Sequence, residues 1–431
     1  MTLVKKIPLW AVILINVNLV VGSAFFLCSP AIAASLGVFS SLAWIGIGLL
    51  MYPLLAAFAD LSRKWPNAGG IYTYCKEALG TWWGFLCGWT YFVGTAAGNA
   101  MVLLALIKIL ETFGIFPDFL AQSAVAKMIF TVACVVISIV ACLFNTEVME
   151  TIQLVLTGLK IIPFLILAMS LIPLFDWSNL TAIPVDLHLA VKDLPFILFG
   201  YIGLEACTAI AGSVEDGENN IARAIMISFS VIMLTYSFFQ FCLIAATGSK
   251  ILTVTNFAQA LNEIILPQLF SSPITVAVFA LLIKSCIAIS YLGGYYNAFF
   301  SNNWVLYAMT KDGCFGNSGI TASKLNRFGA PSLFVYIQGL IVATFCIFST
   351  GILTFADLGI LIGYLLSVAA FIKAFPFKKL TGVLALGGCA ILVLLVSVDI
   401  AEQGLLSLIP FALVTITGLM VYAMTETIET T

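Results

Sequence analysis

The chain has 431 residues, of which 62% are hydrophobic and only 9% are charged, and its formal net charge is −2. A soluble domain carries about 25% charged residues, so this composition excludes a soluble globular protein and predicts an integral membrane protein. The near-neutral charge and the lack of a basic tract exclude nucleic acid as a partner.

Apolar stretches long enough to cross a bilayer recur along the whole chain. A spanning helix needs about 20 mostly apolar residues, whereas a transmembrane barrel shows short alternating segments. Only the long type is seen, so we predict an all-α integral membrane protein with twelve transmembrane helices. The eighth stretch is too long for one simple span, and we expect part of it to tilt or to project beyond the bilayer. The stretches cover approximately residues 9–36, 40–61, 83–112, 124–143, 150–174, 194–213, 224–248, 273–310, 332–350, 354–373, 382–398 and 405–424.

The lysines and arginines between these stretches predict the topology. With a cytoplasmic N-terminus, twelve of them lie in the cytoplasmic segments and four on the opposite side. Cytoplasmic loops carry an excess of basic residues, so both termini are predicted to lie in the cytoplasm. The cytoplasmic set is Lys5, Lys6, Arg63, Lys64, Lys76, Arg223, Lys311, Lys324, Arg327, Lys373, Lys378 and Lys379, against Lys108, Lys127, Lys192 and Lys250.

Residues that build metal or catalytic centres are sparse. The eleven cysteines are scattered without a C-x-x-C pair, and His188 is the only histidine. The sequence shows neither a concentrated set of acidic, basic or metal-binding residues nor the filter sequence of a channel. We therefore predict no cofactor, no metal site and no enzyme, and we treat a membrane-embedded enzyme or a channel as remote alternatives.

Two stretches carry interruptions at equivalent places. Gly22 and Ser23 fall within VVGSAFFLCSPA in the first stretch, and Gly200 and Gly203 fall within FILFGYIGLE in the sixth. Glycine also serves close helix packing, and for Gly22 alone that interpretation is preferred. A helix broken at membrane depth must face protein or a wet cavity. Because each stretch opens a block of five helices, the pair favours an inverted-repeat transporter with its substrate site between the broken helices.

Three charged residues within apolar stretches are candidates for a function, because a charge at membrane depth is costly and marks a functional position. Glu205 follows the second interruption, Lys160 lies in TGLKIIPF of the fifth stretch, and Lys284 lies in LLIKSC of the eighth. Glu205 is predicted either to exchange protons or to hold two helices together by a hydrogen bond. Lys160 is predicted either to carry a proton or to form a fixed internal ion pair. Lys284 has no assigned role.

The motifs, taken in order, resemble one transporter family. They are GSAFF at 22–26, PLLAAFADLSRKWPNAGGIYTYCKEALG at 53–80, IGLEACTAIAG at 202–212, LGGY at 292–295 and Asp-Gly at 312–313. Their order and spacing resemble the amino acid–polyamine–organocation (APC) transporter superfamily. The similarity is greatest to its basic amino acid/polyamine antiporter branch, which includes arginine–agmatine antiporters, and it extends to proton-coupled amino-acid permeases.

The resemblance implies a LeuT-type fold, a 5+5 inverted repeat with broken helices 1 and 6, plus two C-terminal helices. Residues 1–375 then form the ten-helix transport core, with repeats at about 9–174 and 194–373, and residues 376–431 hold helices 11 and 12. The implied activity is sodium-independent alternating-access transport of amino acids or related amines, by exchange, proton coupling or both. A proton-coupled symporter remains the alternative to an antiporter.

The resemblance also implies roles for single residues. The backbone of Gly22, Ser23 and Ala24 would bind the substrate carboxylate, and Ala24 narrows the space where the family has glycine. Carbonyls of the facing break would bind the ammonium, with Phe199 covering the ligand; that break comprises Phe199, Gly200, Ile202 and Gly203.

Further side chains complete the implied site. Tyr91, Asn99 and Tyr295 are implied to line or gate it, although lone tyrosines more often lie in the core or at the membrane interface. Glu205 and Lys160 are assigned to proton coupling. The implied partners are an amino acid or amine, protons and the lipid bilayer, and the implied state is a monomer or homodimer in the bacterial inner (cell) membrane.

Overall fold

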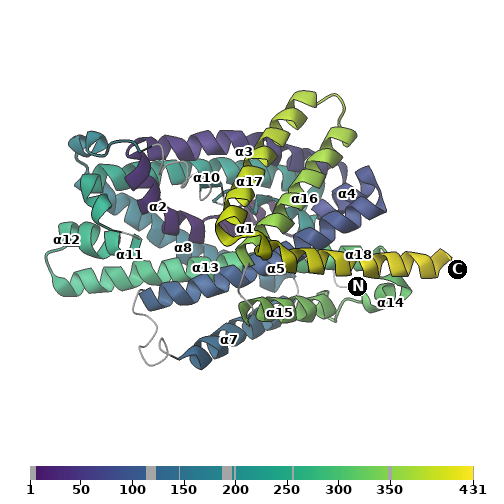
Figure 1. Ribbon diagram of the computed structural model, residues 1–431. Helices are drawn as coiled ribbons and strands as arrows, with labels where there is room; N and C mark the ends of the chain where they lie inside the picture. Colours follow the sequence, from purple (N-terminus) through teal and green to yellow (C-terminus); the bar gives the residue numbers. More distant parts are fainter. Residues whose placement is uncertain are drawn as a thin grey trace.

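The computed structural model describes residues 6–112, 123–144, 146–186, 197–198, 200–254, 257–347 and 352–430. Within these ranges the chain is helical, and its one strand-like feature is an isolated bridge between Ile7 and Val214 (Figure 1). The all-α class predicted from composition is confirmed.

Eight helices of the described residues are long and apolar enough to cross a membrane. Helix breaks and short apolar helices account for several of the other predicted spans, among them Leu9–Val20, Ser332–Ile347 and Lys379–Leu394. The chain is therefore a multi-pass membrane protein. The eight are Phe39–Lys64, Thr81–Glu111, Ala124–Cys142, Glu147–Leu174, Gly217–Thr253, Pro273–Lys311, Ile352–Ala374 and Leu405–Thr425.

The α-helices of the described residues form most of the structure. In chain order they are α1 (Leu9–Val20), α2 (Ser23–Leu36), α3 (Phe39–Lys64), α4 (Ile71–Leu79), α5 (Thr81–Thr112), α7 (Ala124–Cys142), α8 (Thr146–Leu171), α10 (Gly217–Thr247), α11 (Phe257–Gln259), α12 (Leu266–Leu269), α13 (Pro273–Lys311), α14 (Gly316–Ala322), α15 (Ser332–Ile347), α16 (Ile352–Ala374), α17 (Lys379–Gln403) and α18 (Leu408–Thr430). Short 3₁₀ or π turns join them: η1 (Ile172–Leu174), η2 (Trp177–Thr181), η3 (Leu204–Ser213), η4 (Gly248–Thr253), η5 (Ala260–Ile265) and η6 (Leu405–Ser407).

Two of the predicted spans are interrupted where the glycines lie. The first stops at Val20 and restarts at Ser23, so that Val21 and Gly22 separate α1 from α2. In the second, turns at 200–203 precede η3. Gly203 has φ +108°, a backbone conformation that favours glycine. Both interruptions therefore occur where the sequence predicted them.

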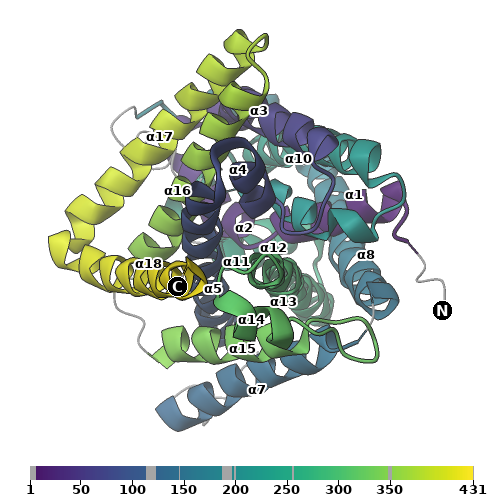
Figure 2. The ribbon, with the colours of Figure 1, turned by 90° about the vertical axis from the view of Figure 1, so that its right-hand side faces the viewer.

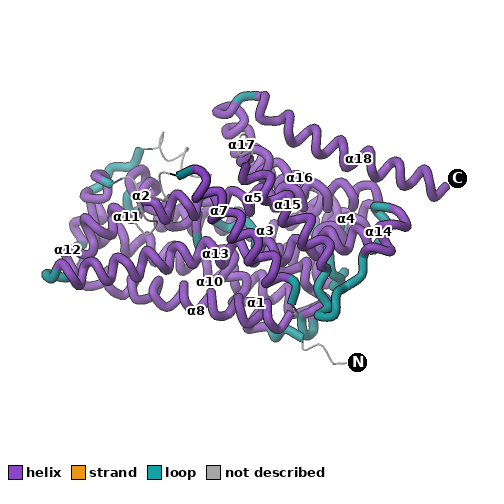
Figure 3. The backbone as a smooth tube through the Cα atoms, turned by 90° about the horizontal axis from the view of Figure 1, so that it is seen from below, coloured by secondary structure: helices purple, strands orange, loops and turns teal. Residues whose placement is uncertain are grey.

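The interrupted segments lie inside a ring of longer helices. α1 packs against α8, α10, α13 and η3, while α5 packs against α13 and α16. α7 and α15 lie side by side along one edge, and α17 and α18 lie at the periphery (Figures 2 and 3). This arrangement packs α1 and η3, which flank the two breaks, against α10 and α13.

The eighth predicted stretch is one continuous helix, α13, of 39 residues. At 1.5 Å per residue it is about 58 Å long, and a bilayer core is about 30 Å thick. The expectation that this stretch exceeds a simple span is confirmed. Its length lets α13 contact both breaks and still reach the loop that follows Lys311.

Candidate functional site

The free end of α1 is held by a lysine. Lys160 of α8 is 2% exposed, and its ammonium donates to the carbonyl of Asn18 at 2.5 Å and to that of Val21. These carbonyls lack helical partners because α1 ends at Val20. A cation at the negative end of a helix is favourable, so Lys160 satisfies the break both by hydrogen bonding and by charge.

Two hydroxyl groups complete the capping of α1. Tyr236 of α10 donates to the Val20 carbonyl at 2.9 Å, and Ser290 of α13 donates to the Val21 carbonyl at 3.0 Å. A Cβ on Gly22 would lie 3.1 Å from the Ser290 hydroxyl oxygen. Glycine therefore lets α13 approach the break closely, and three separate helices supply what lipid cannot.

The second break is stabilised by its own carboxyl group. Glu205 is 1% exposed. Its Oε2 accepts a hydrogen bond from the Gly203 N–H at 3.1 Å, and its Oε1 accepts one from the Tyr91 hydroxyl at 2.9 Å. Glu205 thus fixes the turn at Gly203 and links it to α5, so the side chain has a structural hydrogen bond whatever else it does.

An internal cavity lies between the two breaks. Walls come from α1, α5, η3, α13 and α16, and from Gly70 and Ile71 at the start of α4. Of the predicted site residues, Tyr91, Asn99, Ile202, Gly203 and Glu205 line it. Glu205 is the only charged residue among the described lining residues.

The remaining predicted residues are placed differently. Gly22 is buried beside Ser290, which lines the cavity. Gly200 packs against Trp44, whose ring would lie 2.8 Å from an added Cβ. Tyr295 is buried beside Phe299 and is absent from the described cavity lining.

Three predicted residues remain. Two of them are predicted to bind through their backbone N–H groups, and the third lies outside the described residues. Ser23 and Ala24 begin α2, whose preceding residue Gly22 provides no side-chain cap. Phe199 lies outside the described residues. The binding roles of all the predicted residues stay predictions.

Sequence reasoning missed a polar face of α13. Ser290, Tyr291, Ser301 and Asn302 all line the cavity, and Asn297 donates to the Ile15 carbonyl at 2.8 Å. The signal was present, because buried serines and asparagines recur within an apolar helix. Such groups are costly to bury without partners, and their partners are known only from the structure.

One end of the cavity is closed by the loop before α4. The Gly69 N–H donates to the Ala209 carbonyl of η3 at 3.2 Å. Gly70 has φ +50°, and a Cβ there would lie 2.4 Å from the Thr208 hydroxyl oxygen. Gly70 and Thr208 both line the cavity. Glycine is therefore required for this loop to seal against η3.

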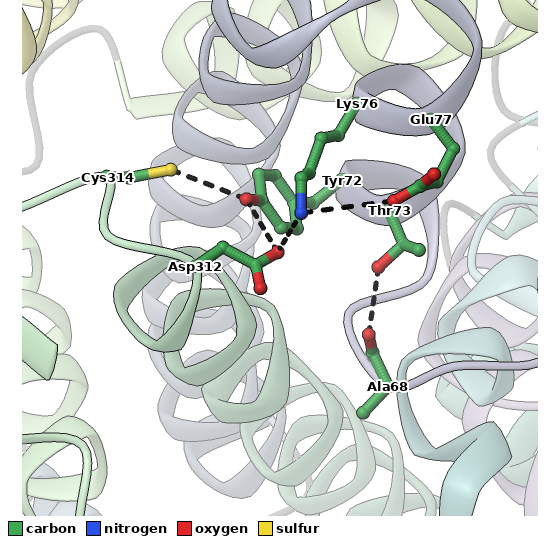
Figure 4. Close-up of polar contacts among 7 residues, drawn as sticks. All are labelled: Ala68, Tyr72, Thr73, Lys76, Glu77, Asp312 and Cys314. Atoms are coloured by element: carbon green, nitrogen blue, oxygen red, sulfur yellow. Dashed lines mark hydrogen bonds and ion pairs between the residues drawn. The ribbon is translucent and has the colours of Figure 1, made fainter.

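A polar cluster fastens α4 to the end of α13 (Figure 4). The Lys76 ammonium lies 2.8 Å from Asp312 Oδ2, which also accepts from the Tyr72 hydroxyl at 3.0 Å. The Tyr72 hydroxyl lies 3.4 Å from Cys314 Sγ. Burial raises the pKa of the Tyr72 phenol and raises that of the Cys314 thiol to about 11. Both groups are therefore protonated at neutral pH. The two donors to Asp312 Oδ2 are the Lys76 ammonium and the Tyr72 hydroxyl.

The segment before α1 is joined to the end of η3. The Ile7 N–H donates to the Ser213 carbonyl at 2.9 Å, and the Glu215 N–H donates to the Ile7 carbonyl at 3.0 Å. Deeper in the protein, the Asn16 amide of α1 lies 3.3 Å from Cys207 Sγ of η3. The two interrupted elements are thus connected at two levels.

A multi-pass helical protein with a cavity between two interrupted helices, lined by apolar residues and a few polar groups, has the architecture of a membrane transporter. The chain belongs to the amino acid permease family, whose model matches residues 7–424. This membership confirms the resemblance to the APC superfamily.

Characterised relatives share low identity with the chain. It is similar to the serine/threonine exchanger of Bacillus subtilis, 25% identical over 64% of this chain and 65% of that protein. It is 24% identical to the arginine/ornithine antiporter of Latilactobacillus sakei, over 54% and 51%, and 23% identical to the lysine-specific permease of Escherichia coli, over 73% and 65%. The chain spans about half to two thirds of the length of these relatives.

Proposed function

We propose that the protein is a secondary active transporter that moves amino acids or related amines by alternating access, without sodium, through exchange, proton coupling or both. The contact of Lys160 with the Asn18 and Val21 carbonyls carries this proposal. A fixed ammonium fills the end of the broken helix, the place where sodium sits in sodium-driven relatives. A second cation there would meet like charge.

The finer architecture belongs to the same proposal. The chain forms the LeuT-type arrangement of twelve transmembrane helices, with repeats at about 9–174 and 194–373 inside a core of residues 1–375. Residues 376–431 supply helices 11 and 12. The matching interruptions at 21–22 and 200–203 support this arrangement, because equivalent breaks in two halves are typical of inverted repeats.

The substrate binds between the breaks. Its carboxylate meets the N–H groups of Gly22, Ser23 and Ala24 at the start of α2, where the helix dipole favours an anion. The position of Ser23 and Ala24 in the first turn of α2 supports this role. The ammonium meets carbonyl groups of the facing break, and Tyr91 and Asn99 contact the rest of the substrate from the cavity wall.

Three further predicted residues have supporting roles in this scheme. Phe199 covers the ligand from the second break. Gly200 and Tyr295 shape the surroundings, since both are buried near the cavity without lining it in the described structure.

Lys160 and Glu205 carry the proton coupling. Each is buried in the protein and contacts the backbone of one break, so a change of protonation alters the support of that break. The names of two relatives, an exchanger and an antiporter, favour exchange. Proton symport is the second candidate, favoured by Lys160.

The protein works in the inner membrane of a bacterium as a monomer or homodimer. Both termini face the cytoplasm, which places α4 and the end of α13 on the cytoplasmic side. The excess of lysine and arginine in these segments supports that orientation.

Counterflow in liposomes tests the proposal. Purified protein is reconstituted in sodium-free buffer with unlabelled amino acid inside, and labelled serine, threonine, arginine, ornithine or lysine is added outside. Saturable uptake that requires internal amino acid and is unchanged by added sodium supports the proposal. Uptake that fails for every amino acid and amine, or that depends on sodium, contradicts it.

A further inference from the structure

The cavity extends far beyond the helix breaks. Ser290 marks the level of the first break, because it donates to the Val21 carbonyl. Asn302, on the same helix, also lines the cavity. The two residues are twelve positions apart, which is about 18 Å along α13 at 1.5 Å per residue. An amino acid carries its carboxylate and ammonium on one carbon, so when these groups are held at the breaks the far part of the cavity is free for something else.

Asn302 presents an unused acceptor in that far part. It is 1% exposed, and its Nδ2 donates to the Phe92 carbonyl of α5 at 2.9 Å. This bond fixes which amide atom is nitrogen. Oδ1 then receives no hydrogen bond from any described group. A buried acceptor without a donor is destabilising, and because Asn302 lines the cavity, a ligand bound there can supply the donor.

The surroundings of Asn302 suit a cation and not an anion. Ser301 and Thr208 line the same region, and Ser301 already uses its proton on the Asn297 carbonyl at 3.0 Å. Its oxygen is left as an acceptor. The described lining contains no lysine or arginine, while Glu205 contributes a carboxylate. A primary ammonium group, which has three donors and no acceptor, matches this set.

We propose that Asn302 and Ser301 form a second binding station for the ammonium group of the transported amino acid, between the helix breaks and the loop at Gly69–Gly70. This inference rests on the proposed transport function and its orientation. A substrate that enters from the cytoplasm meets this station before it reaches the breaks. Asn302 therefore governs apparent affinity from the cytoplasmic face.

Asn303 provides a matched control. It is also 1% exposed and donates through Nδ2, in this case to the Phe299 carbonyl at 2.8 Å. Its Oδ1, like that of Asn302, receives no bond from the described residues. It is absent from the described cavity lining. The two asparagines differ chiefly in facing the cavity, so a substrate effect confined to Asn302 separates binding from packing.

The test compares KM on the two faces, using right-side-out and inside-out membrane vesicles and the amino acid that gives the fastest counterflow. Asn302→Leu raises KM at the cytoplasmic face by about tenfold, as expected for one lost hydrogen bond to a charged group. KM at the external face stays within about twofold, and Asn303→Leu changes neither. Asn302→Thr, which keeps a hydroxyl acceptor, gives a smaller change and serves if the leucine variant does not fold.

The proposed station is wrong if KM is unchanged, which is the result expected of a site that holds only water. It is also wrong if KM changes equally on both faces, or if Asn303→Leu causes the same changes. These outcomes leave wild-type counterflow intact, so the proposed function stands. Absence of counterflow in the wild type rejects the transport function, and the station falls with it.

Discussion

The ammonium of Lys160 and the carbonyl of Asn18 form a 2.5 Å hydrogen bond, although the residues are 142 positions apart. α8 and the end of α1 are joined by this bond at membrane depth. The sequence predicted a function both for Lys160 and for the break after α1. The bond shows that Lys160 also stabilises this break.

Replacing Lys160 by alanine removes both bonds to the end of α1. We expect the free energy of unfolding to fall by about 3 kcal/mol, because two carbonyls lose a charged donor. We also expect uptake to lose its dependence on pH. Thermal unfolding in detergent and uptake measured across pH check the two effects.

The control for that experiment is Lys284→Ala, which removes a half-buried lysine from α13 without touching α1. It should retain pH-dependent uptake. If Lys160→Ala keeps the pH dependence of the wild type, Lys160 has no part in proton coupling.

Tyr91 and Glu205 should behave as a coupled pair. Tyr91→Phe removes the donor to Oε1, and Glu205→Gln replaces the carboxylate that accepts from Gly203. Residues that share a hydrogen bond show coupling of about 1–2 kcal/mol in a double-mutant cycle. Unfolding of the two single variants and the double variant measures this value, and additive effects would argue against the bond.

The same variants bear on transport. Tyr91→Phe is expected to slow counterflow, since Tyr91 lines the cavity and holds the second break. Tyr295→Phe serves as the comparison, because that buried tyrosine is absent from the described lining. A larger effect from Tyr295 would support the role at the substrate site that the sequence predicted for it.

Alanine substitutions at Gly70 and Gly80 can separate the effect of backbone strain from the effect of losing the contact between the loop before α4 and η3. Both have positive φ, so alanine at either position costs about 1–3 kcal/mol. At Gly70 the new methyl group would also overlap Thr208, whereas at Gly80 it meets nothing within 4 Å. We expect Gly70→Ala to lose counterflow and Gly80→Ala to lose stability alone. Equal transport rates in the two variants would show that the contact with η3 is not needed.

The ion pair between Lys76 and Asp312 should contribute little to stability. The two side chains are 26% and 34% exposed, and such pairs contribute about 0–1 kcal/mol. Asp312→Ala is expected to lower the unfolding free energy by no more than this, with a smaller difference in high salt. The exchange Lys76→Asp with Asp312→Lys should recover the loss, and a persistent defect would point to the Tyr72 bond instead.

The two helix breaks could be predicted because glycines and charged residues within apolar stretches can be recognised from the sequence alone. Four residues differ in character from the apolar stretches that contain them, namely Gly22, Gly203, Glu205 and Lys160. Charged residues in particular are costly inside a membrane. No partner has to be known to recognise them.

The wall of the cavity could not be predicted in the same way. α13 is packed by α1, α5, α8 and α15, so its apolar residues follow no single face. Tyr295 was predicted from family resemblance, and Tyr291 and Asn302, which line the cavity, were overlooked, because the rotation of a helix about its axis is set by packing. The seal at Gly70 likewise needs the position of η3, which is 130 residues away in sequence.

Main-chain hydrogen bonds pair Ile7, just before α1, with Ser213 and Glu215 at the end of η3, and among side-chain substitutions only proline removes such a donor. These bonds couple the positions of α1 and η3 to each other. In the proposed transport cycle, a displacement of α1 would therefore move η3 with it, and these two walls of the cavity would shift as one unit.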